Sequence, residues 1–82
     1  MPYVTQKRRA ELDPVVQLMA KVDVKADGDL NYILFAYARY GIKHSYNSLK
    51  NYIGELNETT AEIRRRILAP YEDTKIKENG DV

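Results

Sequence analysis

The stretch that decides the fold is residues 45–70, SYNSLKNYIGELNETTAEIRRRILAP. Seven of its residues follow one another at steps of 3, 4, 3, 4, 3 and 4, and six of the seven are apolar or aromatic. They are Tyr46, Leu49, Ile53, Leu56, Thr60, Ile63 and Ile67, which we call the seam. This spacing is typical of the a and d positions of a coiled coil, so the seam predicts one side of a long helix over residues 45–69.

Two features of this stretch compete with a single helix. Gly54 costs a helix interior about 1 kcal/mol relative to alanine, and Thr59–Glu62 has the form of a capping box that would begin a second helix. Because the seam keeps its register through Gly54 and Leu56, one continuous helix is favoured. In that helix Gly54 would let another backbone approach closely. Pro70 is expected to end or kink the helix.

The preceding segment, residues 29–40, is apolar almost all round. Leu30, Ile33, Leu34 and Tyr37 follow the helical period, and Tyr32, Phe35 and Ala36 make the other side apolar as well. A helix of this kind is buried on several sides, so it is expected at the centre of the fold or under another subunit. Asp27 or Asp29 can cap its start, and Gly41 is expected to end it in the left-handed conformation.

The first part of the chain predicts two short helices. Thr5 can cap a helix over residues 6–12, and Asp13-Pro14 has the pattern of a cap and first position of a second helix over 14–23. Beyond Pro70, the order of charges suits a short fifth helix over 70–78. The sequence therefore predicts an all-α fold, a small bundle of four to five helices with one long C-terminal helix, in a single domain over 1–82. The expected core residues are Val15, Val16, Met19, Leu30, Ile33, Leu34, Tyr37, Leu49, Ile53, Leu56 and Ile63.

The tail, residues 70–82, carries Tyr71 and Ile76 among charges of both signs. A free terminal segment of this length is usually disordered unless something holds it. We expect these two side chains to dock on the helical domain or on a neighbouring subunit.

Composition excludes several kinds of site. The 82 residues contain no cysteine and one histidine, which excludes disulfides, thiol nucleophiles and a two-histidine metal site. The net charge of +1 argues against a dedicated binder of duplex DNA. No apolar run approaches the ~20 residues that span a bilayer, and Glu11 and Asp13 interrupt any signal-peptide pattern. A cytoplasmic protein of a bacterial or infected host cell, without cofactor or metal, is expected.

Several motifs resemble those of a family of small uncharacterised proteins. They are Met1–Gln6 with Arg8-Arg9, Leu30–Tyr32, Ser45–Asn47, Ile53-Gly54, and the tail Ala69–Asp73 with Glu78–Val82. The family occurs in bacteria, prophages and phages. The resemblance implies an all-helical domain in a phage or mobile-element setting, and it carries no activity to transfer.

Candidate functional residues fall into two groups. Arg64, Arg65, Arg66 and Arg39 could hold phosphates, with Tyr37 and Tyr40 stacking on a base. The helix dipole explains the arginine triplet without a ligand, and Glu62, Glu72 and Asp73 could neutralise it. Large apolar side chains form the second group, a candidate oligomer or partner interface, consisting of Tyr32, Phe35, Tyr52, Tyr71 and Ile76.

No nucleophile setting, calcium loop or phosphate-binding glycine loop occurs, and His44 has no catalytic partner in the sequence. The expected function is that of a non-enzymatic helical protein that self-associates as a homo-oligomer and binds a protein partner. The alternative is a protein that sequesters a nucleotide or nucleic acid.

Overall fold

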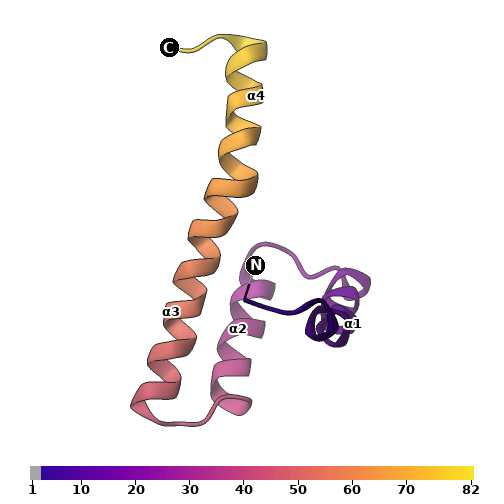
Figure 1. The fold of residues 1–82 in the computed structure, drawn as a ribbon, viewed down its shortest axis with the longest axis vertical. Coiled ribbons are helices and arrows are strands. Elements are labelled where there is room, and N and C mark those ends of the chain that lie inside the picture. The colour runs from indigo at the N-terminus through magenta and orange to yellow at the C-terminus, as the bar shows by residue number, and fades with distance from the viewer. Residues whose placement is uncertain (1–2) are drawn as a thin grey trace. The chain divides into compact units, whose positions relative to one another are not determined.

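The computed structural model describes residues 3–82, and every regular element in that range is a helix. The elements are α1 (Gln6–Val22), α2 (Gly28–Tyr40), α3 (Tyr46–Ile63), the π-helical segment η1 (Arg64–Leu68) and α4 (Ala69–Asn79) (Figure 1). Helix contacts divide the chain into two units, one ending at Tyr37 and the other running from Ala38 to Val82. The predicted all-α class is confirmed, and so is the long C-terminal helix.

The predicted count of four to five helices is wrong, because Pro14 and Pro70 lie inside continuous helical stretches. Residues 6–12 and 14–23 form one helix, α1, with Pro14 in its interior. Pro14 releases the carbonyl of Ala10, but Ala10 is exposed and water can bond that carbonyl. Thr5 caps the helix as predicted, since its hydroxyl accepts a hydrogen bond from the Arg8 backbone N–H at 3.2 Å.

The end of α1 is a left-handed turn at Asp23, with φ of 63° and ψ of 56°. The Asp23 N–H donates to the Ala20 carbonyl at 3.1 Å, and the Val24 N–H donates to the Met19 carbonyl at 3.0 Å. This pair of bonds is the Schellman motif, which also brings an apolar residue after the helix against one in its last turn. The predicted left-handed glycine at Gly41 is wrong, since Asp23 and Gly80 hold the positive φ angles of residues 3–82.

Local capping fixes both ends of α2. Of the two candidates for its start, Asp27 is the cap, because its carboxylate accepts from the Asp29 N–H at 3.0 Å. At the other end, His44 lies 2.7 Å from the Arg39 carbonyl through Nε2. A carbonyl only accepts, so Nε2 carries the proton, and His44 satisfies one of the free carbonyls at the end of the helix.

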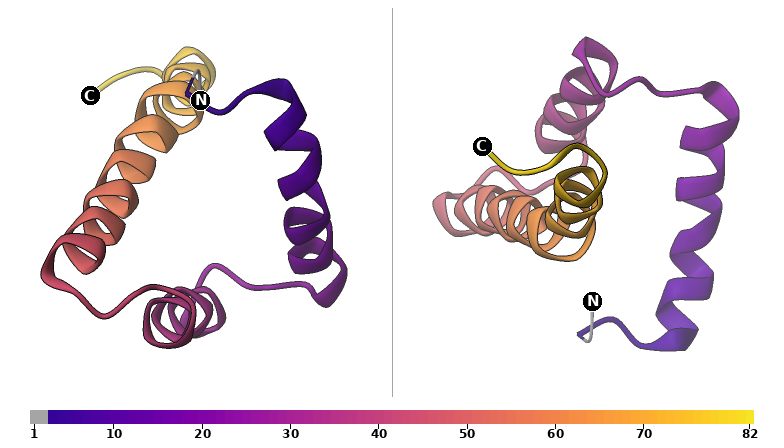
Figure 2. Two further views of the ribbon diagram at one scale, coloured as in Figure 1. Left: turned by 60° about the horizontal axis from the view of Figure 1, so that its bottom comes forward. Right: turned by 90° about the horizontal axis from the view of Figure 1, so that it is seen from above.

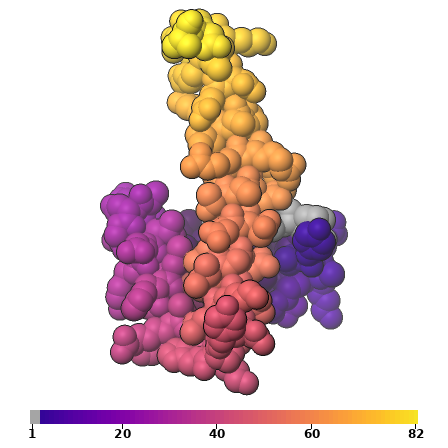
Figure 3. Space-filling model, turned by 90° about the vertical axis from the view of Figure 1, so that its left-hand side faces the viewer, coloured from indigo at the N-terminus to yellow at the C-terminus, as the bar shows by residue number. Residues whose placement is uncertain are grey.

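The second unit consists mainly of α3, η1 and α4, which follow one another without a break (Figures 1 and 2). We call this continuous helical segment, Tyr46–Asn79, the rod. Its 34 residues correspond to about 50 Å at the rise of an α-helix. Ser45 caps it by accepting from the Ser48 N–H at 3.1 Å. The space-filling view shows the rod as one column of side chains up to its tip (Figure 3).

The rod resolves the choice between one helix and two at Thr59 and Thr60. Both hydroxyls donate back into the helix, Thr59 to the Glu55 carbonyl at 2.8 Å and Thr60 to the Leu56 carbonyl at 3.1 Å. A capping threonine would instead accept from a backbone N–H ahead of it. Residues 46–63 are therefore one helix, as the seam predicted.

Pro70 neither ends the rod nor breaks it. Proline has no N–H for the carbonyl four residues before it, and its ring crowds that carbonyl. The chain avoids the conflict by widening the preceding turn, so that the Ala69 N–H bonds the Arg64 carbonyl five residues back. The predicted short helix over 70–78 is thus the continuation of the rod as α4.

No residue between 3 and 82 is buried, so the predicted core is wrong for the single chain. Met19, Leu30, Ile33, Leu34, Leu49 and Leu56 are half-buried, whereas Val15, Val16, Tyr37, Ile53 and Ile63 are exposed. The seam residues of the rod are not buried because their unit contains no further complete helix that could lie along the rod. The sequence pattern identified an apolar side correctly but not what covers it.

Candidate interaction surface

The seam lies along the rod with its large side chains open to solvent. The exposed fractions are 79% for Tyr46, 58% for Ile53, 49% for Ile63 and 65% for Ile67. Leu49 and Leu56 are half-buried. Isolated helices depend on packing of their apolar side for stability in water, so this surface is suited to contact with another protein surface.

The widened turn η1 extends the seam into α4. Ile63 and Tyr71 are eight residues apart, which would rotate Tyr71 by about 80° away from the seam in a regular α-helix. The π turn accommodates one additional residue, so the eight-residue step becomes equivalent to the seven-residue steps of the seam. Tyr71, which is 58% exposed, therefore continues the same side of the rod.

A tyrosine with a lysine four residues later stands at each end of this surface. The Lys50 ammonium lies 5.8 Å from the ring centroid of Tyr46, and the Lys75 ammonium lies 5.6 Å from that of Tyr71. Such cation–π contacts contribute about 0.5–1 kcal/mol at exposed sites. The two ends of the surface therefore carry the same chemical arrangement.

The arginine triplet lies in η1 and is partly neutralised within the rod. Arg65 Nη2 lies 3.0 and 3.1 Å from the two carboxylate oxygens of Glu62, and Arg66 lies 3.6 Å from Glu62. The hydrogen bond from Arg65 holds the pKa of the Glu62 carboxyl below its ordinary value of 4.5. Glu62 thus partly neutralises the arginine triplet, as expected, whereas Glu72 and Asp73 make no ion pair with the triplet among residues 3–82.

The structure does not bring all the candidate phosphate residues together. The Arg39 guanidinium lies 5.8 Å from the ring centroid of Tyr40, which is 81% exposed. Arg39 precedes α3 and the triplet follows it, so the 18 residues of α3, about 27 Å of helix, separate the two groups. They form two cationic positions rather than one phosphate clamp.

The remaining candidate interface residues are distributed over α2 and the rod. Tyr32 and Phe35 of α2 are exposed, and Tyr52 of α3 is half-buried. Ile76 lies on α4 and is exposed, like Tyr71. Residues 70–82 are all exposed, and docking of the tail on the helical domain or on a neighbouring subunit stays a prediction.

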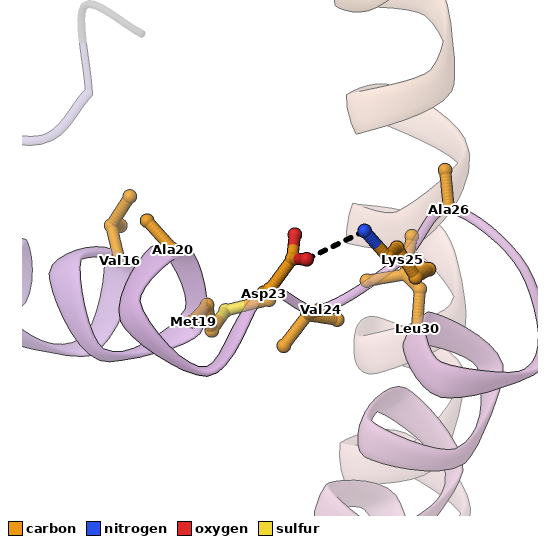
Figure 4. Close-up of a pocket in the computed structure, with 8 residues that line it drawn as sticks. All are labelled: Val16, Met19, Ala20, Asp23, Val24, Lys25, Ala26 and Leu30. Carbon is orange, nitrogen blue, oxygen red and sulfur yellow. Dashed lines mark hydrogen bonds and ion pairs between the residues drawn. The ribbon is translucent and has the colours of Figure 1, made fainter.

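A cavity of about 290 Å³ lies at the end of α1 and the start of α2, within the first unit (Figure 4). Its walls are mostly apolar, with the Asp23–Lys25 ion pair at 2.6 Å on one side. The residues around it are Val16, Met19, Ala20, Asp23, Val24, Lys25, Ala26 and Leu30. The Schellman motif creates this cavity by placing Val24 beside Met19.

Sequence reasoning missed the π turn, the left-handed Asp23 and the cavity beside it. The only signal for the π turn was Pro70 after a seam that did not stop. For Asp23 there was no such signal.

Across the part of the chain that the structure describes, no cluster of histidine and acidic residues could hold a metal ion. The helices in the same range are too short or too polar to cross a membrane.

The fold and surface define a small all-helical protein with an exposed apolar stripe along the rod. The chain belongs to the family described as Domain of unknown function (DUF6899), whose model matches residues 1–82. Searches of curated proteins and of solved structures gave no match. The expected membership of an uncharacterised family is thereby confirmed.

Proposed function

We propose that this protein is a non-enzymatic helical interaction module that self-associates through the seam and presents its remaining apolar surface to a protein partner. The observation that carries the proposal is the exposure of the seam on a helix with no covering element in its own unit. The phage or mobile-element setting implied by the sequence motifs adds the expectation that the partner is a phage or host protein.

Energetics support self-association. Ordering the backbone costs about 1–2 kcal/mol per residue, and burial of apolar side chains is the main term that offsets this cost. Each large side chain moved from water into a contact contributes about 1.5–3 kcal/mol when fully buried. Ile53, Ile63 and Ile67 offer that contribution only when a second surface covers them.

Light scattering and sedimentation of the purified chain test the proposal. We expect a dimer or larger oligomer at micromolar concentration, and a shift toward monomer in the Ile53→Gln and Ile63→Gln variants. Ala61→Gln is the matched control, because it introduces the same side chain on an exposed position away from the seam. A strict monomer at high micromolar concentration, or equal effects of all three substitutions, would contradict the proposal.

The alternative function, sequestration of a nucleotide or nucleic acid, draws on the exposed Arg39–Tyr40 pair and on Arg64. Because α3 separates these groups, a mononucleotide would not reach both. We expect no thermal stabilisation by a panel of nucleotides. Salt-dependent binding of one of them, lost on Arg39→Gln, would favour the alternative.

A further inference from the structure

The charged residues beside the seam are all positive between Tyr46 and Ile67. Where the seam supplies the a and d positions of a coiled coil, the residues beside it are the e and g positions, which set the choice of partner. Along one flank these positions are Lys50, Asn57 and Arg64, and all three are exposed. The Lys50 ammonium lies over the ring of Tyr46, on the edge of the seam. Neither cation forms an ion pair among residues 3–82, so this flank presents two positive charges without an acidic partner.

The other flank and the back of the rod add no negative charge to this surface. The g positions are Tyr52, Thr59 and Arg66, and the last of these lies 3.6 Å from Glu62. The acidic residues of the same stretch lie about 130–170° around the helix from the centre of the seam. They are Glu55, Glu58 and Glu62. A neighbour on the seam therefore meets apolar side chains with positive charge beside them.

Beyond Ile67 the charges are mixed. Glu72 follows Tyr71 directly, while Lys75 lies over the Tyr71 ring. The surface with charge of one sign is thus the 22 residues from Tyr46 to Ile67, about 33 Å of helix.

We propose that the protein partner binds the seam itself, in exchange for the second copy, and that it does so with an acidic amphipathic helix. The inference rests on the proposed function, in which the seam is the contact surface, and adds the chemistry of the partner. Such a helix has apolar residues at steps of three and four, which pack between those of the seam. Aspartate or glutamate beside them faces Lys50 and Arg64, which are 14 residues, or two heptads, apart.

A second copy covers the apolar side chains but brings positive flanks of its own. In either direction of pairing, the charges that two copies place beside the seam over residues 46–67 are those of lysine and arginine, and like charges close together repel. An acidic helix buries the same isoleucines and replaces this repulsion by attraction, so mass action favours it when it is present. The two contacts also respond oppositely to salt, because screening weakens the attraction and relieves the repulsion.

An anionic membrane fits these observations less well than a helix does. Lipid-binding segments gather about four to eight lysines and arginines, and helices that lie on membranes are basic on their polar face. The rod contains six basic and six acidic residues, and three glutamates stand at the centre of its polar side. A helix contacts only the seam and its flanks, where the charge is positive.

Three synthetic helices of about three heptads test the chemistry of the partner. They share leucine and isoleucine at the a and d positions, and their e and g positions are all glutamate, all glutamine or all lysine. Fluorescence anisotropy of each labelled peptide measures its binding to the full chain, and sedimentation measures whether the chain stays self-associated. We expect the glutamate peptide to bind about fivefold tighter than the glutamine peptide at low salt, and the lysine peptide to bind weakest. The glutamate peptide should convert the self-associated chain into a one-to-one complex.

Charge reversal on the flank tests which residues select the peptide. In the variant with Lys50→Glu and Arg64→Glu, the order of affinities should reverse, so that the lysine peptide binds tightest. The matched control combines Lys43→Glu with Lys77→Glu, which changes the net charge by the same amount at exposed positions outside residues 46–67. Binding of the lysine peptide also shows that the flank variant still folds.

The outcomes separate this inference from the proposed function. Equal affinities of the glutamate and glutamine peptides, an unreversed order in the flank variant, or a complex that stays self-associated would overturn the inference while self-association stands. Binding to vesicles that contain anionic lipid, with binding to none of the peptides, would overturn it in favour of a membrane. A strictly monomeric chain that binds the glutamate peptide would overturn self-association and support the acidic partner. A monomer that binds no peptide would overturn both.

Discussion

Gly54 provides a direct test of how the rod is built. It lies in the interior of α3, and a Cβ added there would meet nothing within 4 Å. It also lies about 130° around the helix from the centre of the seam. Gly54→Ala therefore adds a methyl group that touches neither the described chain nor the proposed contact.

The magnitude follows from the backbone alone. Alanine is more favourable than glycine in a helix interior by about 0.8–1.0 kcal/mol. For a chain of this length that corresponds to a rise in the thermal midpoint of about 4–8 °C. Circular dichroism at 222 nm during heating measures the midpoint, and sedimentation measures association at the same concentrations.

Two results would refute this reasoning. An unchanged or lower midpoint in dilute, monomeric protein would mean that α3 is not continuous through residue 54. Higher helicity with weaker association would mean that another backbone lies against Gly54, as the sequence first indicated, so that the contact surface would not be the seam. Asn57→Ala is a suitable control for a general gain in helix propensity, since it is exposed on the same helix.

The remaining predictions concern the helix ends and one ion pair. Asp23→Gly should stabilise the first unit by about 1 kcal/mol, since glycine adopts the left-handed conformation freely, and the exposed Asp23–Lys25 ion pair that the substitution removes contributes less. Thermal unfolding measures the change in stability, and a loss of stability would show that the ion pair contributes more than the backbone strain. Ser45→Ala should destabilise the start of the rod by about 1 kcal/mol, whereas Ser45→Asp should retain the cap. Amide hydrogen exchange in residues 46–49 measures the difference, and equal exchange rates in the two variants would argue against a capping role for Ser45. The pKa of Glu62 is lowered in the folded chain, so its contribution is present above pH 4.5 and is lost as the pH falls through the lowered value. Helicity followed by circular dichroism should therefore lose less on acidification in Glu62→Gln than in the unmodified protein, and identical acid profiles would exclude the Arg65 contact as the cause.

Those features that depend on a few neighbouring residues could be predicted from the sequence. Thr5 was identified as a cap because a hydroxyl before a helical pattern has one common use. The seam predicted α3 because residues at this spacing lie on one side of a helix. Asp27 and Asp29 remained alternatives because both have the right chemistry, and only the backbone geometry distinguishes them.

The number of helices and the burial of the core residues depend on interactions beyond a few neighbouring residues, which local sequence patterns do not describe. Pro14 and Pro70 each cost one backbone hydrogen bond, and in both places the chain tolerates that cost in exposed helix. Burial of Ile53 and Ile63 depends on what lies against the rod, and their spacing in the sequence does not identify that neighbour. The candidate interface residues share this property, since a pattern of apolar side chains identifies a surface but not its neighbour.

The wide turn before Pro70 limits how this chain can change in length during evolution. Adding or deleting one residue between Ile63 and Tyr71 would turn everything beyond it by about 100° about the helix axis. The connection between α2 and α3, residues 41–45, is a loop and could absorb such a change without rotating either helix. Natural variants of this chain should therefore differ in length at the loop and keep the eight-residue step from Ile63 to Tyr71.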